Sequence, residues 1–163
     1  MKTSMMWIAA TAIAVATAAH ADDPSATKNK AVFLNAKDVK WMPAIPDLPK
    51  GAEMTVLYGD PSKPGMYAMR LEMPDGYKIP PHWHSQDEQL TVLEGTLVLH
   101  MGDTMKADPH QLDVGGYHFL PAKMHHAAEA KGGTTIVQVQ GMGPFDIHYL
   151  NPADNPNPKA ASK

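Results

Sequence analysis

The sequence predicts an all-β domain, and three observations support this prediction. Short runs rich in β-branched and aromatic residues recur along the chain, and turns containing Pro or Gly separate them. Several of these runs alternate apolar and polar residues, and no helical period of useful length appears. A chain of 163 residues can also enclose one sizeable core. Together these features favour a single-domain β-sandwich or β-barrel.

The amino terminus predicts export. A basic start at Lys2 precedes an apolar stretch over residues 5–19, and Ala19-His20-Ala21 then forms a small-x-small cleavage site. The apolar stretch is too short for a stable membrane span. We therefore expect residues 1–21 to be a signal peptide, the mature chain to start at Asp22, and the protein to reach the periplasm. The chain has no Cys, so its stability must come from its core, a metal or a partner subunit.

Residues 22–50 are expected to form an N-terminal extension. Its first residues are polar and are predicted to be loose, and residues 31–42 are predicted to form a strand and a short turn. Prolines at 43, 46 and 49 then exclude a helix. Two strands follow, over residues 54–58 and 66–73, and the Pro/Gly-rich segment 59–65 is a turn by composition.

Two hairpins are predicted in the second half of the chain. The first joins strands 89–93 and 96–101 at Glu94-Gly95, and the second joins strands 126–130 and 134–140 at Lys131-Gly132-Gly133. A strand over 111–120 is expected between them and a last strand over 145–150. The polar, Pro-rich segment 151–163 is interpreted as a flexible C-terminal tail.

Three side chains after Gly76 have a spacing that suits one metal ion. His82 and His84 are two residues apart, so in an extended strand both imidazoles leave the same face, and Glu88 keeps this parity. Two imidazoles and a carboxylate suit a divalent first-row metal such as Zn, Fe, Mn, Ni or Cu. A fourth ligand must come from elsewhere in the chain.

Residues 76–95 and 115–130 together resemble the two motifs of the cupin superfamily. The first motif, G-x5-H-x-H-x3,4-E-x6-G, is matched without a gap by Gly76, His82, His84, Glu88 and Gly95. In the second motif, G-x5-P-x-G-x2-H-x3-N, the matching residues are Gly115, Pro121 and His126. Lys123 and Ala130 depart from it, and Lys123 stands where a glycine normally provides positive φ, which a lysine adopts only with strain.

The resemblance implies a jelly-roll barrel over residues 51–150 that holds one divalent metal through His82, His84, Glu88 and His126. The family spacing selects His126 over its neighbour, and adjacent strand residues cannot both face inward, so His125 is expected at the rim. Leu90 and Val92 share the parity of Glu88 and are expected to line the pocket. Four further polar residues are weaker candidates, of which His100 and His118 are expected on the outer sheet face: Arg70, Tyr77, His100 and His118.

Three classes of function remain open from the sequence. The resemblance implies either a metal-dependent enzyme, such as a dioxygenase in which Glu88 also takes the substrate proton, or a protein that binds a metal or small ligand without turnover. A structural barrel with an incidental metal is the third class. The expected partner is a small molecule, and a homodimer is also open. With one Arg, Arg70, and a net charge of −3, the chain is a poor candidate for a nucleic-acid-binding protein.

Overall fold

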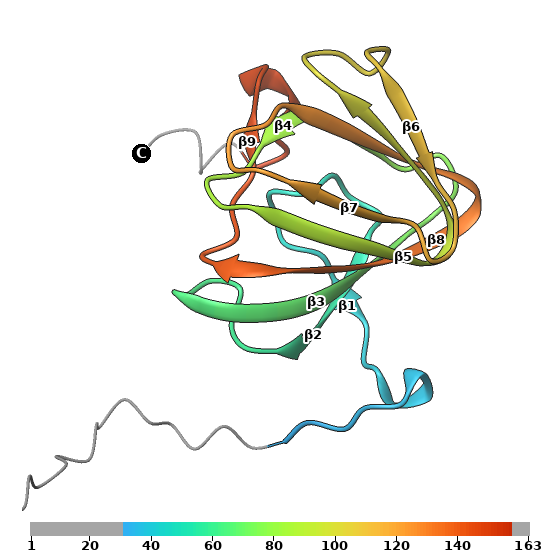
Figure 1. Cartoon of the computed structure of the whole chain (residues 1–163), viewed down its shortest axis with the longest axis vertical. Helices are drawn as coiled ribbons and strands as arrows, with labels where there is room; N and C mark the ends of the chain where they lie inside the picture. Colours follow the sequence, from blue (N-terminus) through green and yellow to red (C-terminus); the bar gives the residue numbers. More distant parts are fainter. Residues whose placement is uncertain (1–30, 158–163) are drawn as a thin grey trace, which may run out of the picture. The chain divides into compact units, whose positions relative to one another are not determined.

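The computed structural model describes residues 31–157, and within them the chain is almost entirely β-structure, as predicted (Figure 1). The signal-peptide prediction for residues 1–21 and the loose segment over 22–30 lie outside the described residues. In the described part of the chain, no helix is both long and apolar enough to cross a membrane. The strands in chain order are β1 (Met42–Pro43), β2 (Glu53–Tyr58), β3 (Gly65–Met73), β4 (Lys78–Trp83), β5 (Glu88–Met101), β6 (Pro109–Leu112), β7 (Tyr117–Leu120), β8 (His126–Gly143) and β9 (His148–Tyr149).

All strand pairs are antiparallel, and β5 and β8 form the centre of the arrangement (Figure 1). One edge of β8 pairs with β5, while its other edge pairs first with β4 and then with β3, giving the order β1-β2-β3-β8-β4-β9. The strand β5 also pairs with β6 and β7. The long strands β5 and β8 each pair with several other strands of the jelly-roll barrel. Residues at the ends of different strands can therefore meet in one interior.

Both predicted hairpins are wrong, because β5 and β8 each continue through the expected turn. The pairing of β5 with β8 is irregular between Val92 and Thr96, which marks a bulge rather than a reversal of the chain. Gly95 has a φ of 71°, and a Cβ there would collide with the backbone of Thr134 and Thr135. The glycine therefore allows two bent strands to approach each other closely.

Three further strand predictions need correction. The first predicted strand is reduced to the two residues of β1 after a short 3-10 helix, η1 (Ala36–Asp38), and the run 111–120 is divided into β6 and β7. The last predicted strand is reduced to β9. Within the segment interpreted as a tail, the described part contains a second 3-10 helix, η2 (Pro152–Asp154), and Asn157 donates a hydrogen bond to Asp47 over 2.9 Å.

The core lies on the inward face of β3, β5 and β8. In β3 the residues Tyr67, Met69, Leu71 and Met73 are buried, while the alternate residues are more exposed, as the sequence alternation indicates. Val92, Val137 and Val139 are almost completely buried and continue this layer across β5 and β8. This layer forms one wall of the interior in which the histidines lie.

Candidate metal centre

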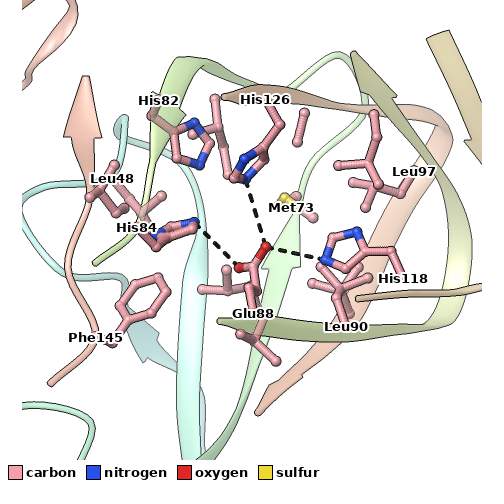
Figure 2. Close-up of a pocket in the computed structure, with 17 residues that line it drawn as sticks. Leu48, Met73, His82, His84, Glu88, Leu90, Leu97, His118, His126 and Phe145 are labelled. Atoms are coloured by element: carbon pink, nitrogen blue, oxygen red, sulfur yellow. Dashed lines mark hydrogen bonds and ion pairs between the residues drawn. The ribbon is translucent and has the colours of Figure 1, made fainter. Parts of the chain in front are cut away.

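Strand ends bring His82, His84, Glu88 and His126 together. His82 lies near the end of β4 and is the cross-strand partner of His126, the first residue of β8. His84 follows β4 directly, and Glu88 is the first residue of β5. The exposed fractions of these four residues lie between 2% and 8%. All four line one cavity, and Figure 2 shows Glu88 facing His84 and His126.

Each histidine is held by a backbone carbonyl through its Nδ1 atom. The carbonyl oxygens of Pro80, Asp146 and Met124 lie 2.7, 2.5 and 3.0 Å from Nδ1 of His82, His84 and His126, respectively. A carbonyl oxygen can only accept a hydrogen bond, so each Nδ1 carries a proton and Nε2 is the nitrogen that each ring has left to bind a metal. A hydrogen bond of this kind from Nδ1 orients a histidine so that its Nε2 can bind a metal.

The three imidazoles also converge closely enough for one ion. Each offers a nitrogen, and these three nitrogens all lie within 4.8 Å of one another. The Nε2 atom of His84 is buried without a hydrogen-bond partner, and a carboxylate oxygen of Glu88 lies 3.5 Å from it. The other oxygen of Glu88 lies 3.7 Å from Nε2 of His126. Lone pairs facing a carboxylate repel one another unless a cation or proton lies between them, so the residues present fit a bound metal.

His118 is a further residue of the site, and the prediction that it lies on the outer sheet face is wrong. It lies on β7 opposite Leu90 of β5, lines the cavity and is 8% exposed. Its Nε2 atom donates a hydrogen bond to Oε2 of Glu88 over 3.2 Å (Figure 2). The neighbouring Tyr117 and Phe119 point the other way and are 53% and 50% exposed. In the sequence, only the apolar Leu120, which shares the parity of His118, points to this placement, and the apolar Tyr117 and Phe119 of the opposite parity obscure it.

Burial and mutual contact set the protonation of the cluster. Burial lowers the pKa of His82 well below its ordinary value, and the nearby His126 and His84 lower it further. Burial also lowers the pKa of His126. Burial alone would raise the pKa of Glu88, but the imidazoles of His84, His118 and His126 outweigh it and hold that pKa below its usual range. A cluster with neutral imidazoles and an ionised carboxylate has the protonation that metal ligation requires.

The second motif keeps its turn despite its departure from the family pattern. Lys123 adopts a φ of 65°, the conformation for which the family normally has glycine. Its N–H donates to the carbonyl of His84 over 2.8 Å, which ties the second motif to the first. His125 does not line the cavity and instead contacts Asp103, with 2.7 Å between Nδ1 and Oδ1. The structure thus brings His126, and not His125, to the cluster.

The remaining polar candidates have contacts outside the cavity. Arg70 donates to Gln138 across the sheet over 3.3 Å, and the hydroxyl of Tyr77 donates to the carbonyl of Pro49 over 2.5 Å. His100 does not line the cavity, since it alternates with the inward-facing Leu99, but it is buried at 7% exposure, and its Nε2 lies 3.8 Å from Glu129.

The cavity around the cluster is small and has apolar walls. Its volume is about 30 Å³, which is room for roughly two water molecules. Leu90 lines it, as its parity with Glu88 predicts, whereas Val92 is buried in the adjoining core. Leu48 and Phe145 complete the wall from segments that the sequence did not connect with the site. The ring of Phe145 lies 5.1 Å from that of His84, so it covers the cluster on that side (Figure 2).

Solved structures with the same fold include cupins of several kinds. The polyketide cyclase RemF from Streptomyces resistomycificus is 19% identical, with a TM-score of 0.66 over 78% of this chain and 90% of that chain. A proposed acetylacetone dioxygenase from Methylibium petroleiphilum PM1 is 17% identical, with a TM-score of 0.60 over 80% and 88% of the two chains. An RmlC-like cupin protein from Ralstonia eutropha JMP134 is 21% identical, with a TM-score of 0.56 over 76% and 74%.

These likenesses establish the cupin fold. No curated protein matches the chain. The profile of one protein family, described as a domain of unknown function (DUF4437), matches residues 4–148. The chain therefore belongs to the DUF4437 family, and the fold of its described domain is that of the cupin superfamily.

Proposed function

We propose that this protein is a mononuclear-metal cupin of the periplasm, with oxygenase-type activity on a small organic substrate. In this proposal one divalent transition metal is held by His82, His84, Glu88 and His126. The observation that carries it is the convergence of three imidazoles on one another, each with its Nδ1 atom held by a backbone carbonyl, beside the Glu88 carboxylate. The donor set suits Fe, Mn, Ni, Cu or Zn.

A bound metal of this kind would supply Lewis-acid chemistry and, if redox-active, a site for O2 activation. The chain's own residues provide the proton transfer. Glu88 has one oxygen toward His84 and one toward His118, so its carboxylate can accept a proton from an enolisable carbon acid or a hydroxyl group in the cavity. His118 fixes the direction of that carboxylate, and the walls formed by Leu90 and Phe145 exclude water.

Two of the three solved structures named above guide the choice of substrates for testing. A polyketide cyclase and a proposed acetylacetone dioxygenase share this fold, and both names refer to compounds that carry enolisable carbonyl groups. We therefore favour β-diketones and flavonols as the first compounds to assay.

A second function, binding without turnover, is favoured by the size of the cavity. About 30 Å³ accommodates a metal with small ligands but not a diketone or a flavonol unless the wall moves. In this alternative the protein holds a metal or a small ligand in the periplasm.

Metal analysis combined with an oxygen electrode separates the two functions. The mature protein, isolated from its native compartment, should contain about one metal per chain. The Fe(II), Mn, Ni and Cu forms should then be supplied with acetylacetone and with a flavonol. Consumption of O2 that requires both metal and substrate supports the oxygenase. No consumption by any form, combined with a higher Tm in the presence of a small ligand, would favour the binding protein.

A further inference from the structure

A second and larger cavity lies mainly on the outer face of the sheet and reaches the residues on either side of Glu88. It has a volume of about 510 Å³ and is a groove over β3, β8 and the start of β5, which lie next to one another (Figure 1). We call it the outer groove, and the residues that line it are Tyr58, Met66, Tyr67, Ala68, Gln86, Asp87, Gln89, Gln140, Gly141 and Met142. Its volume is that of a site for a drug-sized organic molecule, whereas the cavity at the metal cluster is far smaller.

One layer of side chains separates the outer groove from the metal cluster. Tyr67 lines the groove and Phe145 lines the metal cavity, and their rings meet edge to face with 6.0 Å between the centroids. Tyr67, Glu88 and Phe145 also line one small crevice together, so the two rings lie beside Glu88. In the sheet register Tyr67 and Glu88 both pair with Gly141, and the Tyr67 hydroxyl lies beside this glycine. A molecule in the groove is therefore next to the layer that covers Glu88.

The charges around the groove disfavour an anionic ligand. No Lys or Arg lines it, and its one charged residue, Asp87, already accepts a hydrogen bond from the N–H of Ala122 over 2.8 Å. An anion such as a phosphate or a carboxylate would thus find no counter-charge there. The side-chain amides of Gln86, Gln89 and Gln140 can both donate and accept hydrogen bonds, which suits a ligand that carries hydroxyl and carbonyl groups.

The apolar part of the groove favours a flat ring system. Met66 and Met142 are cross-strand neighbours and are 69% and 52% exposed, and Tyr58 is 38% exposed. Thioethers are adaptable and make favourable contacts with aromatic rings. The floor of the groove is formed by the paired strands β3 and β8. It is shallow because the side chain of Ala68 on β3 is small.

From these observations we infer that the outer groove is the docking site for a flat, uncharged aromatic molecule that carries hydroxyl and carbonyl groups. The inference rests on the proposed function, because it names the substrate class and the place where the substrate waits next to the metal cluster. Tyr67 and Phe145 form the wall that it must displace to reach Glu88.

The test uses 3-hydroxyflavone, whose fluorescence reports its surroundings, and the mature full-length protein after treatment with EDTA. Metal must be removed because this flavonol also chelates metal ions. We expect one molecule to bind per chain. Met142→Asp places a charge in the groove and should weaken binding at least about tenfold. Met42→Asp, at an exposed methionine of similar accessibility outside the groove, should leave binding unchanged.

A second pair of variants keeps the test independent of the introduced charge. Ala68→Trp should fill the groove and weaken binding at least about tenfold, while Thr91→Trp, which faces outward on β5 but does not line the groove, should not. Binding that disappears with the metal, or that the groove variants leave intact, would overturn the inference. Conversion of a dimer into a monomer by Met142→Asp would also overturn it, because a second copy would then occupy the groove. If the metal-loaded wild type binds the flavonol but consumes no O2, the proposed oxygenase activity is wrong, whereas the assignment of the outer groove as the binding site still holds.

Discussion

His118 donates a hydrogen bond to Glu88 inside the buried cavity, with 3.2 Å between Nε2 and Oε2. Since an ionised carboxylate only accepts hydrogen bonds, the proton lies on Nε2 of His118, and its Nδ1 atom remains buried without a partner. The contact leaves the other oxygen of Glu88 directed at His84. His118 therefore fixes the carboxylate with Oε1 toward His84 and Oε2 toward His126.

Removing this contact should weaken metal binding. His118→Phe keeps a ring in the cavity but cannot donate, so we expect metal affinity to fall by roughly 10- to 100-fold, as is typical when a group that orients a ligand is lost. His118→Gln retains a donor and should recover part of the affinity. Isothermal titration of the EDTA-treated protein with Zn measures both variants. Equal affinity in His118→Phe and wild type would show that the hydrogen bond does not position Glu88.

Glu88→Gln should separate metal binding from turnover. The amide keeps the size of the side chain but cannot take up the substrate proton, so O2 consumption should disappear while most of the metal stays bound. The measurements are metal content and oxygen uptake on the same sample. A Glu88→Gln protein that loses its metal would instead make Glu88 chiefly a ligand.

The histidine pair 125–126 provides a matched control for the metal cluster. His82→Ala removes one of the three converging nitrogens and should reduce metal occupancy strongly. His125→Ala breaks only the contact with Asp103 and should leave occupancy close to that of the wild type. Metal content after gel filtration measures both. The reverse result would assign the fourth ligand to His125.

The metal-free protein should become less stable as the pH falls from 7.5 to 5. Burial holds the pKa of His82 and His126 below the ordinary 6.5 in the folded chain. Below that pH the unfolded chain binds protons that the folded chain does not, so stability rises with pH across this window and is lost on acidification. Thermal denaturation of the EDTA-treated protein measures the slope. His82→Leu should flatten it, whereas His110→Leu, at an exposed histidine, should not.

Export should yield a mature N-terminus at Asp22. The residues before it, Ala19 and Ala21, are the small residues that signal peptidase recognises. Intact-mass spectrometry of the protein from a periplasmic extract measures the start directly. Replacing Ala21 with Arg should block cleavage and leave the precursor. Recovery of the chain from the cytoplasm with Met1 intact would contradict the proposed location.

The sequence could place His82, His84 and Glu88 on one face because their spacing is local, whereas His126 was found only through the resemblance to the second cupin motif; all four line one cavity. His82 and His84 are two residues apart, and an extended chain must direct both to one side. The inward direction of Leu90 and the outward direction of Trp83 follow from the same rule, and Trp83 indeed stacks on His148, with 3.9 Å between the ring centroids, away from the cluster.

Two parts of the molecule could not be predicted in this way. Gly95 and Gly132 look like turn residues in a local window, but only the partner strand shows that the chain continues through them. In β7 the alternation misleads, because Tyr117 and Phe119 appear more apolar than His118 yet face outward. The inward position of His118 is stabilised by Glu88, which is 30 residues earlier in the chain.

The segment after β8 joins two properties of the site that would otherwise be independent. The carbonyl of Asp146 holds Nδ1 of His84, its carboxylate accepts the N–H of Ser85, and the preceding Phe145 covers the cavity. A displacement of this segment large enough to uncover Glu88 would also release the ring of His84 from the orientation that suits a metal. A movement that admits a large molecule would therefore also weaken the hold on the ion. We expect metal occupancy to fall when a molecule displaces Phe145 to enter the cavity.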